Sequence, residues 1–79
     1  MTAKIHITLK PGILDPQGKT IQHGLAALGL AGITEVRVGK VIELTLEDMV
    51  PERARAVVAE ACHKLLANPV IENYSISFE

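Results

Sequence analysis

The stretch from Gly12 to Thr20 has the residue types of a phosphate-binding loop. It reads GILDPQGKT and ends in Gly-Lys-Thr, but five residues separate its two glycines, whereas a P-loop has four. Pro16 removes one backbone N–H donor, and Asp15 would repel an anion. We therefore expect a connection between a strand and a helix here, and no nucleotide site.

The histidines and the cysteine are the other groups that bind metals or act as nucleophiles in proteins. His6, His23 and His63 are widely separated, and Cys62 next to His63 on a helix would point in a different direction. Cys62 also lies beside an apolar helix face, where a buried and unreactive thiol is the usual outcome. The sequence therefore predicts no metal site and no catalytic residue.

Length and composition indicate one small domain, residues 1–79, whose core is built from aliphatic side chains. A hydrophobic fraction of 48% is high for such a short chain, so we expect part of the apolar surface to form an interface between subunits. The net charge is −1 and the charges are interspersed. This argues against nucleic-acid binding and against attachment to a membrane. A single cysteine and no apolar run of about 20 residues fit a cytoplasmic protein.

Two amphipathic segments at the start of the chain predict a strand and a helix. Residues 4–10 alternate between apolar and polar side chains, as in a half-buried strand. Asp15 is the expected N-cap of the helix, and Pro16 its first residue. The expected buried stripe of this helix consists of Ile21, Leu25 and Leu28.

The central stretch, residues 35–46, reads EVRVGKVIELTL and predicts a β-hairpin. A bulged or three-residue turn near Gly39 keeps the apolar side chains on one face. In that register Val36 faces Leu44, and Arg37 faces Glu43 on the other side of the sheet.

A second helix and a last strand complete the pattern. The helix begins at Pro51 and ends at Asn68-Pro69, and the strand covers residues 71–78 with Tyr74, Ile76 and Phe78 on its core face. The expected buried face of the helix is Ala54, Val57, Val58, Ala61 and Leu65.

This order of elements is βαββαβ, an α+β fold. Its simplest form is a four-stranded antiparallel sheet with both helices on one face, the ferredoxin-like plan. The helices would cover Ile7, Val36, Leu44 and Ile76.

Three further functions can be weighed from the residues alone. A small hydrolase of the acylphosphatase type would need an Arg near the first strand-to-helix loop, which has only Lys10. RNA binding would need exposed aromatic side chains, whereas Tyr74 and Phe78 are assigned to the core. A ferredoxin-like regulatory oligomer that binds a small ligand is harder to exclude, since such sites form from ordinary residues.

Separated motifs in this chain resemble the PurS family. They are LDPQG at 14–18, QH at 22–23, VRVGK at 36–40 and LLANPVIE at 65–72, together with Tyr74. The motifs follow one another in the family's order over nearly the whole chain.

The resemblance implies a non-catalytic subunit of phosphoribosylformylglycinamidine synthase. In that complex a large synthetase subunit uses ATP and Mg²⁺, and a glutaminase subunit releases ammonia from glutamine. The small subunit, a homodimer or higher oligomer without a cofactor of its own, joins them and supports ammonia transfer. The motif positions we expect to bind partners are Asp15, Gln17, His23, Arg37 and Lys40. Those we expect to be structural are Pro16 in the helix start, Gly39 in the turn and Asn68 at the helix end.

Overall fold

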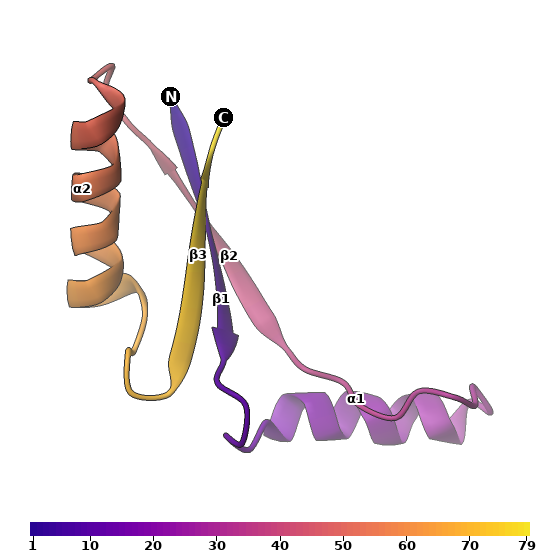
Figure 1. Ribbon diagram of the computed structural model, residues 1–79. Coiled ribbons are helices and arrows are strands. Elements are labelled where there is room, and N and C mark those ends of the chain that lie inside the picture. The colour runs from indigo at the N-terminus through magenta and orange to yellow at the C-terminus, as the bar shows by residue number, and fades with distance from the viewer.

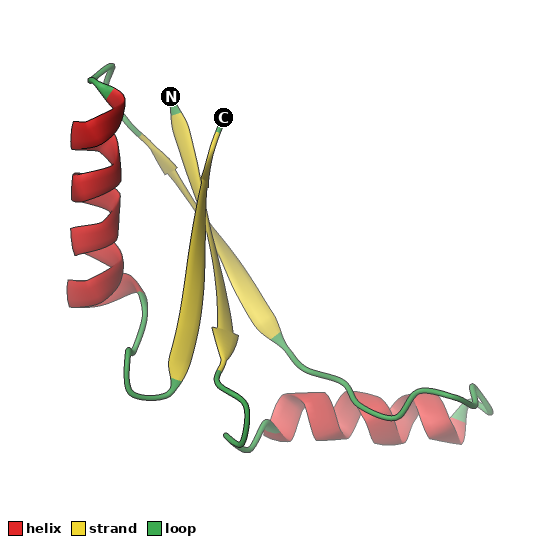
Figure 2. Ribbon diagram, in the orientation of Figure 1, coloured by secondary structure: helices red, strands yellow, loops and turns green.

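The computed structural model describes residues 1–79 as a three-stranded sheet with two helices (Figures 1 and 2). In chain order the elements are β1 (Thr2–Leu9), α1 (Pro16–Ala27), β2 (Gly39–Thr45), α2 (Pro51–Ala61), a π-helical turn η1 (Cys62–Leu66) and β3 (Glu72–Phe78). Neither helix is long and apolar enough to cross a membrane.

The sheet is antiparallel throughout, with β1 between β2 and β3. Ile5 lies opposite Ile42 on one side and Ile76 on the other. The alternation predicted for β1 is confirmed, since Ala3, Ile5 and Ile7 are buried. One face of the sheet is therefore apolar at its centre.

The predicted four-stranded sheet is wrong, because residues 33–38 form no strand. The hairpin is absent, and β2 pairs with β1 instead, with Glu43 opposite Lys4. Two side chains hold the segment elsewhere. The carboxylate of Asp15 accepts the backbone N–H of Val38, and Arg37 donates to carbonyls of the loop before α1.

Helix α2 covers the apolar face of the sheet (Figure 1). Ala54, Val58 and Cys62 follow one another at intervals of four residues and are all buried. The π-helical turn η1 then holds one residue more than an α-helical turn would. For this reason Leu65, predicted to be buried, is 82% exposed, while Leu66 packs against the core. Val57, also predicted to be buried, is exposed as well.

Helix α1 does not cover the sheet, so the prediction of two helices on one face is wrong. It extends away from the sheet, and the chain returns beside it (Figure 1). We call residues 16–38 the arm. Ile21 and Leu28, expected to be buried, are exposed. The radius of gyration is 16.2 Å, against about 12 Å for a compact domain of this length.

Candidate functional site at the base of the arm

Four of the five expected partner-binding residues lie where the arm joins the sheet. Asp15, Gln17 and Lys40 line one cavity there, and Arg37 contacts the loop beside it. His23 is exposed, farther along α1. The site is therefore formed by the end of β1, the start of α1 and the start of β2.

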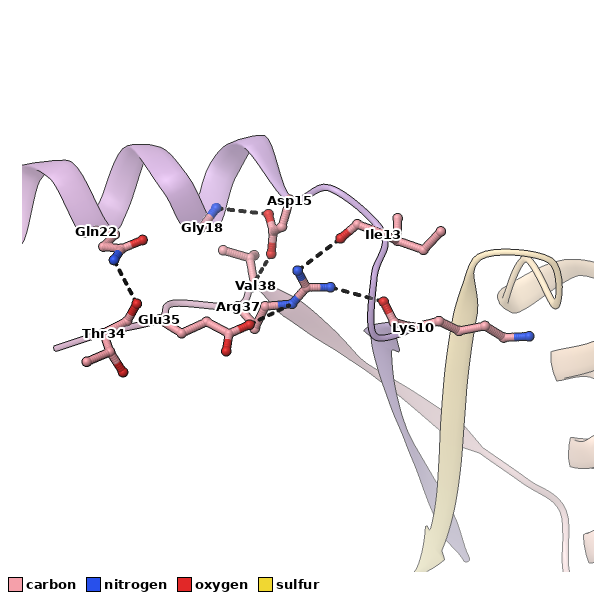
Figure 3. Close-up of polar contacts among 9 residues, drawn as sticks. All are labelled: Lys10, Ile13, Asp15, Gly18, Gln22, Thr34, Glu35, Arg37 and Val38. Atoms are coloured by element: carbon pink, nitrogen blue, oxygen red, sulfur yellow. Dashed lines mark hydrogen bonds and ion pairs between the residues drawn. The ribbon is translucent and has the colours of Figure 1, made fainter.

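Asp15 connects the two halves of the arm (Figure 3). The backbone N–H of Gly18 donates to its Oδ1 at 2.8 Å, which makes Asp15 the predicted N-cap of α1. The backbone N–H of Val38 donates to Oδ2 at 2.7 Å. These bonds, to Val38 first and then Gly18, lower the pKa of the carboxyl below its usual 3.8. Asp15 is thus buried, ionised and fully engaged in the chain's own structure.

Arg37 holds the loop that leads into α1. Its Nη1 donates to the carbonyl of Ile13 at 2.9 Å, and its Nη2 to the carbonyl of Lys10 at 3.2 Å (Figure 3). Its Nε also lies 4.0 Å from Oε1 of Glu35. The predicted pair with Glu43 within the chain is wrong, since Glu43 lies 3.8 Å from Lys4.

The cavity beside these contacts measures about 220 Å³. Its lining combines the polar residues Gln17, Lys40 and Glu72 with the apolar residues Ile7 and Leu9. The side chains of Gln17 and Lys40 make no hydrogen bond or ion pair within the chain. Their side chains are therefore free to contact another molecule.

Two glycines allow the backbones at this site to come close. A Cβ on Gly39 would lie 2.6 Å from the carbonyl oxygen of Ile7. Gly39 is thus required by the approach of β2 to β1, and its predicted role in a turn is wrong. A Cβ on Gly18 would overlap the carbonyl oxygen of Val36, so the returning chain also lies directly against α1.

Glu72, the first residue of β3, also lines the cavity and is bonded to the turn before the strand. The side chain of Asn68 accepts the backbone N–H of Val70 at 3.0 Å, and the backbone N–H of Asn68 donates to Glu72 at 2.6 Å. The sequence reasoning missed Glu72 as a lining residue. Its position in the quoted motif at 65–72, next to a strand start, was the available signal.

The cleft is lined by one cationic side chain, Lys40, by the amide of Gln17 and by two carboxylates, of which Asp15 is engaged within the chain. No three His, Cys, Asp or Glu side chains come together as metal ligands would. These groups can form hydrogen bonds and ion pairs with a protein or a small polar ligand. No nucleophile with a neighbouring base is among them.

Comparison with known proteins identifies relatives over almost the whole chain. Residues 2–79 match the model of the family PurS, phosphoribosylformylglycinamidine (FGAM) synthase. The PurS subunit of that synthase from Synechocystis sp. is 49% identical over 90% of this chain and 71% of its own. The PurS subunit from Methanocaldococcus jannaschii is 44% identical over 98% of this chain and 93% of its own.

Solved structures agree with this result. The crystal structure of M. jannaschii PurS, one of the subunits of formylglycinamide ribonucleotide amidotransferase, superposes with a TM-score of 0.87 over 99% of this chain and 94% of that one. A chain of the PurLQS structure from Thermotoga maritima is 33% identical and superposes with a TM-score of 0.82, covering 98% of this chain and 96% of its own.

Proposed function

This chain belongs to the PurS family and is a subunit of FGAM synthase in purine biosynthesis, and we propose that it joins the glutaminase and ATP-dependent synthetase subunits and supports ammonia transfer between them. The observation that carries the proposal is the likeness to a chain of the PurLQS structure over nearly its full length. The chemistry of the site supports it too, because the cavity at the base of the arm has polar side chains that can bind a partner subunit.

The proposed mechanism is a difference in affinity. A subunit without reactive groups raises the flow of ammonia only if it binds the docked arrangement of the two enzymes more tightly than the separated one. A tenfold gain in the docked population corresponds to about 1.4 kcal/mol of coupling. A few polar contacts between subunits are enough to supply this amount.

Gln17 and Lys40 are the proposed contacts with the partner subunits. Both are exposed, and their side chains make no hydrogen bond or ion pair within the chain, whereas the side chains of Asp15 and Arg37 are bonded to the arm and to the loop before it. His23 is a further candidate on the exposed surface of α1. We propose that Asp15 and Arg37 act by positioning the arm, and not by touching the partners.

A homodimer is the proposed form of the subunit, and the cytoplasm its proposed location. The exposed apolar side chains of α1, among them Ile21 and Leu28, support an interface with another copy. We propose that ATP, Mg²⁺ and glutamine are used by the partner subunits.

The test compares two activities of the cognate synthetase and glutaminase, with and without this chain. We expect glutamine-dependent FGAM formation to require the chain, and ammonia-dependent FGAM formation to proceed largely without it. A chain that changes neither activity would refute the coupling role. Lys40→Ala should lower only the glutamine-dependent rate, and the matched control Lys64→Ala, which removes an exposed lysine of η1, should leave both rates unchanged.

A further inference from the structure

Strand β3 is an outer strand of the sheet, with β1 on one side and no strand on the other (Figure 1). Thr2 and Glu79 exchange both backbone hydrogen bonds, at 2.9 and 3.3 Å. The odd-numbered residues of β3 are therefore those bonded to β1. The even-numbered residues Tyr74, Ile76 and Phe78 direct their N–H and C=O groups away from the sheet, where the chain offers them no partner.

Residues 73–78 lack the features that keep an exposed edge from pairing. Natural edge strands are protected by charged side chains, above all lysine, by proline or by a bulge. This stretch reads NYSISF and contains no charged residue and no proline, and its pairing with β1 runs without a bulge. All of its residues except Ile76 are exposed. The edge is therefore open to another chain.

The chain's only two aromatic side chains, Tyr74 and Phe78, lie on this strand. The sequence assigns both to the core, but they are 38% and 37% exposed. A cleft of about 140 Å³ opens beside Phe78, where Pro51 and Ala54 of α2 also line it. Exposed aromatic side chains next to a small cleft are typical anchors of a protein interface. The edge of β3 thus combines free backbone groups with aromatic anchors.

A subunit that joins two others needs two separate contact surfaces. The base of the arm offers one of them, through Gln17 and Lys40. Strand β1 lies between Lys40 on β2 and the edge of β3. Phe78 pairs with Ala3, at the end of the sheet far from the arm (Figure 1). The base of the arm and the edge of β3 can therefore be occupied at the same time.

We propose that β3 binds an extended segment of the partner subunit that does not contact the base of the arm. The segment adds a strand to the sheet and pairs through its backbone with Tyr74, Ile76 and Phe78. Its side chains are apolar on the face of the two aromatic residues and uncharged and polar on the face of Ser75 and Ser77. The proposal rests on the joining role and names the second surface that this role requires.

A second copy of β3 fits this edge less well. Two copies pair along the whole strand through their even-numbered residues only when Ser75 lies on the twofold axis. Glu72 then faces Phe78 at both ends, which sets a carboxylate against an aromatic side chain. The exposed apolar side chains of α1, among them Ile21 and Leu28, already support the interface with another copy. A different chain is therefore the better partner of this edge.

Amide exchange tests the pairing in the unmodified protein. In the chain alone, the amides of Tyr74, Ile76 and Phe78 should exchange quickly, whereas those of Ser75 and Ser77, bonded to β1, should be protected. The cognate synthetase and glutaminase are then added separately. One of them, and not the other, should slow the three outward amides about 100-fold or more. Quenching the exchange and dissolving the protein in a denaturing solvent allows NMR to resolve each amide.

Two substitutions at Tyr74 separate the backbone from the side chain. Tyr74→Ala removes the aromatic group, and Tyr74→Pro also removes the outward N–H, a change that an edge strand tolerates. The dissociation constant for the subunit bound at β3 should rise about tenfold for Tyr74→Ala, and about threefold more for Tyr74→Pro. Lys40→Ala should weaken the binding of the other subunit instead. Protection of the Ser75 and Ser77 amides reports that each variant is folded.

The outcomes separate the edge of β3 from the joining role. Outward amides that stay unprotected in the complete complex overturn the pairing and leave the joining role in place. Outward amides that are protected in the chain alone and lose this protection on dilution would assign the edge to a second copy, which also overturns the proposal. The same holds if Tyr74→Pro and Lys40→Ala weaken the same subunit. A chain that joins neither subunit overturns both the pairing and the joining role.

Discussion

Substituting Gly39 tests whether the approach of β2 to β1 is as close as the structure has it. In Gly39→Ala the added methyl group would lie 2.6 Å from the carbonyl oxygen of Ile7 and 3.1 Å from the methyl group of Thr8. Real contacts of this kind need well over 3 Å, so the strands must separate where Thr8 and Gly39 pair. We expect Gly39→Ala to lower the stability of the fold.

The magnitude follows from two opposing effects. Overpacking costs about 1–3 kcal/mol, and replacing glycine by alanine returns about 0.4–1 kcal/mol by restricting the unfolded chain. The central values, about 2 and about 0.7 kcal/mol, leave a net loss of about 1.3 kcal/mol, which lowers the melting temperature of a domain of this size by roughly 5–10 °C. Circular dichroism at one fixed protein concentration measures it, since association also changes the melting temperature.

Gly24→Ala is the matched control. Gly24 lies within α1, and a Cβ there would meet nothing within 4 Å. Helix propensity predicts a gain of about 0.5–1 kcal/mol and a melting temperature higher by roughly 2–8 °C. A Gly39→Ala protein as stable as the wild type would refute the reasoning.

Gly39→Asn distinguishes close packing from the turn that the sequence suggested. Asparagine is better tolerated than alanine where a turn needs a positive φ. Where space is the limit, the larger side chain is at least as harmful as alanine. We expect Gly39→Asn to be no more stable than Gly39→Ala, and a clear advantage for asparagine would support the turn.

Three further predictions concern single side chains. The pKa of Asp15 is lower in the fold than its ordinary 3.8, so its contribution to stability is complete above pH 3.8 and is lost as the pH falls through the lower folded value. Asp15→Asn should therefore be less stable than the wild type at pH 7 and lose less stability on acidification. Urea unfolding at several pH values can measure both differences. Burial raises the pKa of the Cys62 thiol, so a thiol reagent at pH 8 should react at least about tenfold more slowly with the native protein than in urea, and equal rates would contradict its burial. Arg37→Ala should loosen the loop at Lys10 and Ile13, visible as faster amide exchange there, while the amides at the centre of β1 keep their protection; unchanged exchange in the loop would rule out its anchoring role.

Local signals in the sequence predicted the first strand and the start of α1. The alternation in residues 4–10 gave the buried face of β1, and Asp15-Pro16 gave the cap and first residue of the helix. The strand alternation and the helix cap each depend on residues close together in the sequence, so they can be predicted without knowing the rest of the fold.

Pairing between distant segments was not predictable in the same way. The stretch around Gly39 has the alternation of a hairpin, but alternation does not indicate which strand a segment pairs with. In the structure β2 pairs with β1. The apolar stripe of α1 likewise indicates a face to be covered without saying by what. At the candidate site, the motifs pointed to Asp15, Gln17, Arg37 and Lys40, but only the folded chain separates the two free side chains from the two that are engaged.

The π-helical turn at Cys62–Leu66 accommodates one additional residue between two parts of the chain whose positions are fixed by other contacts. One is Val58 in the core, and the other is the Asn68 turn that directs the chain into β3. The additional residue is taken up inside the helix, where a widened turn keeps both ends in phase, so the loop needs no change. Deleting Lys64 would let the last turn close as an ordinary α-helix while Val58 and Asn68 keep their relative orientation, because the widened turn holds the additional residue. This turn should therefore tolerate the loss of one residue better than an α-helical turn of α2 would.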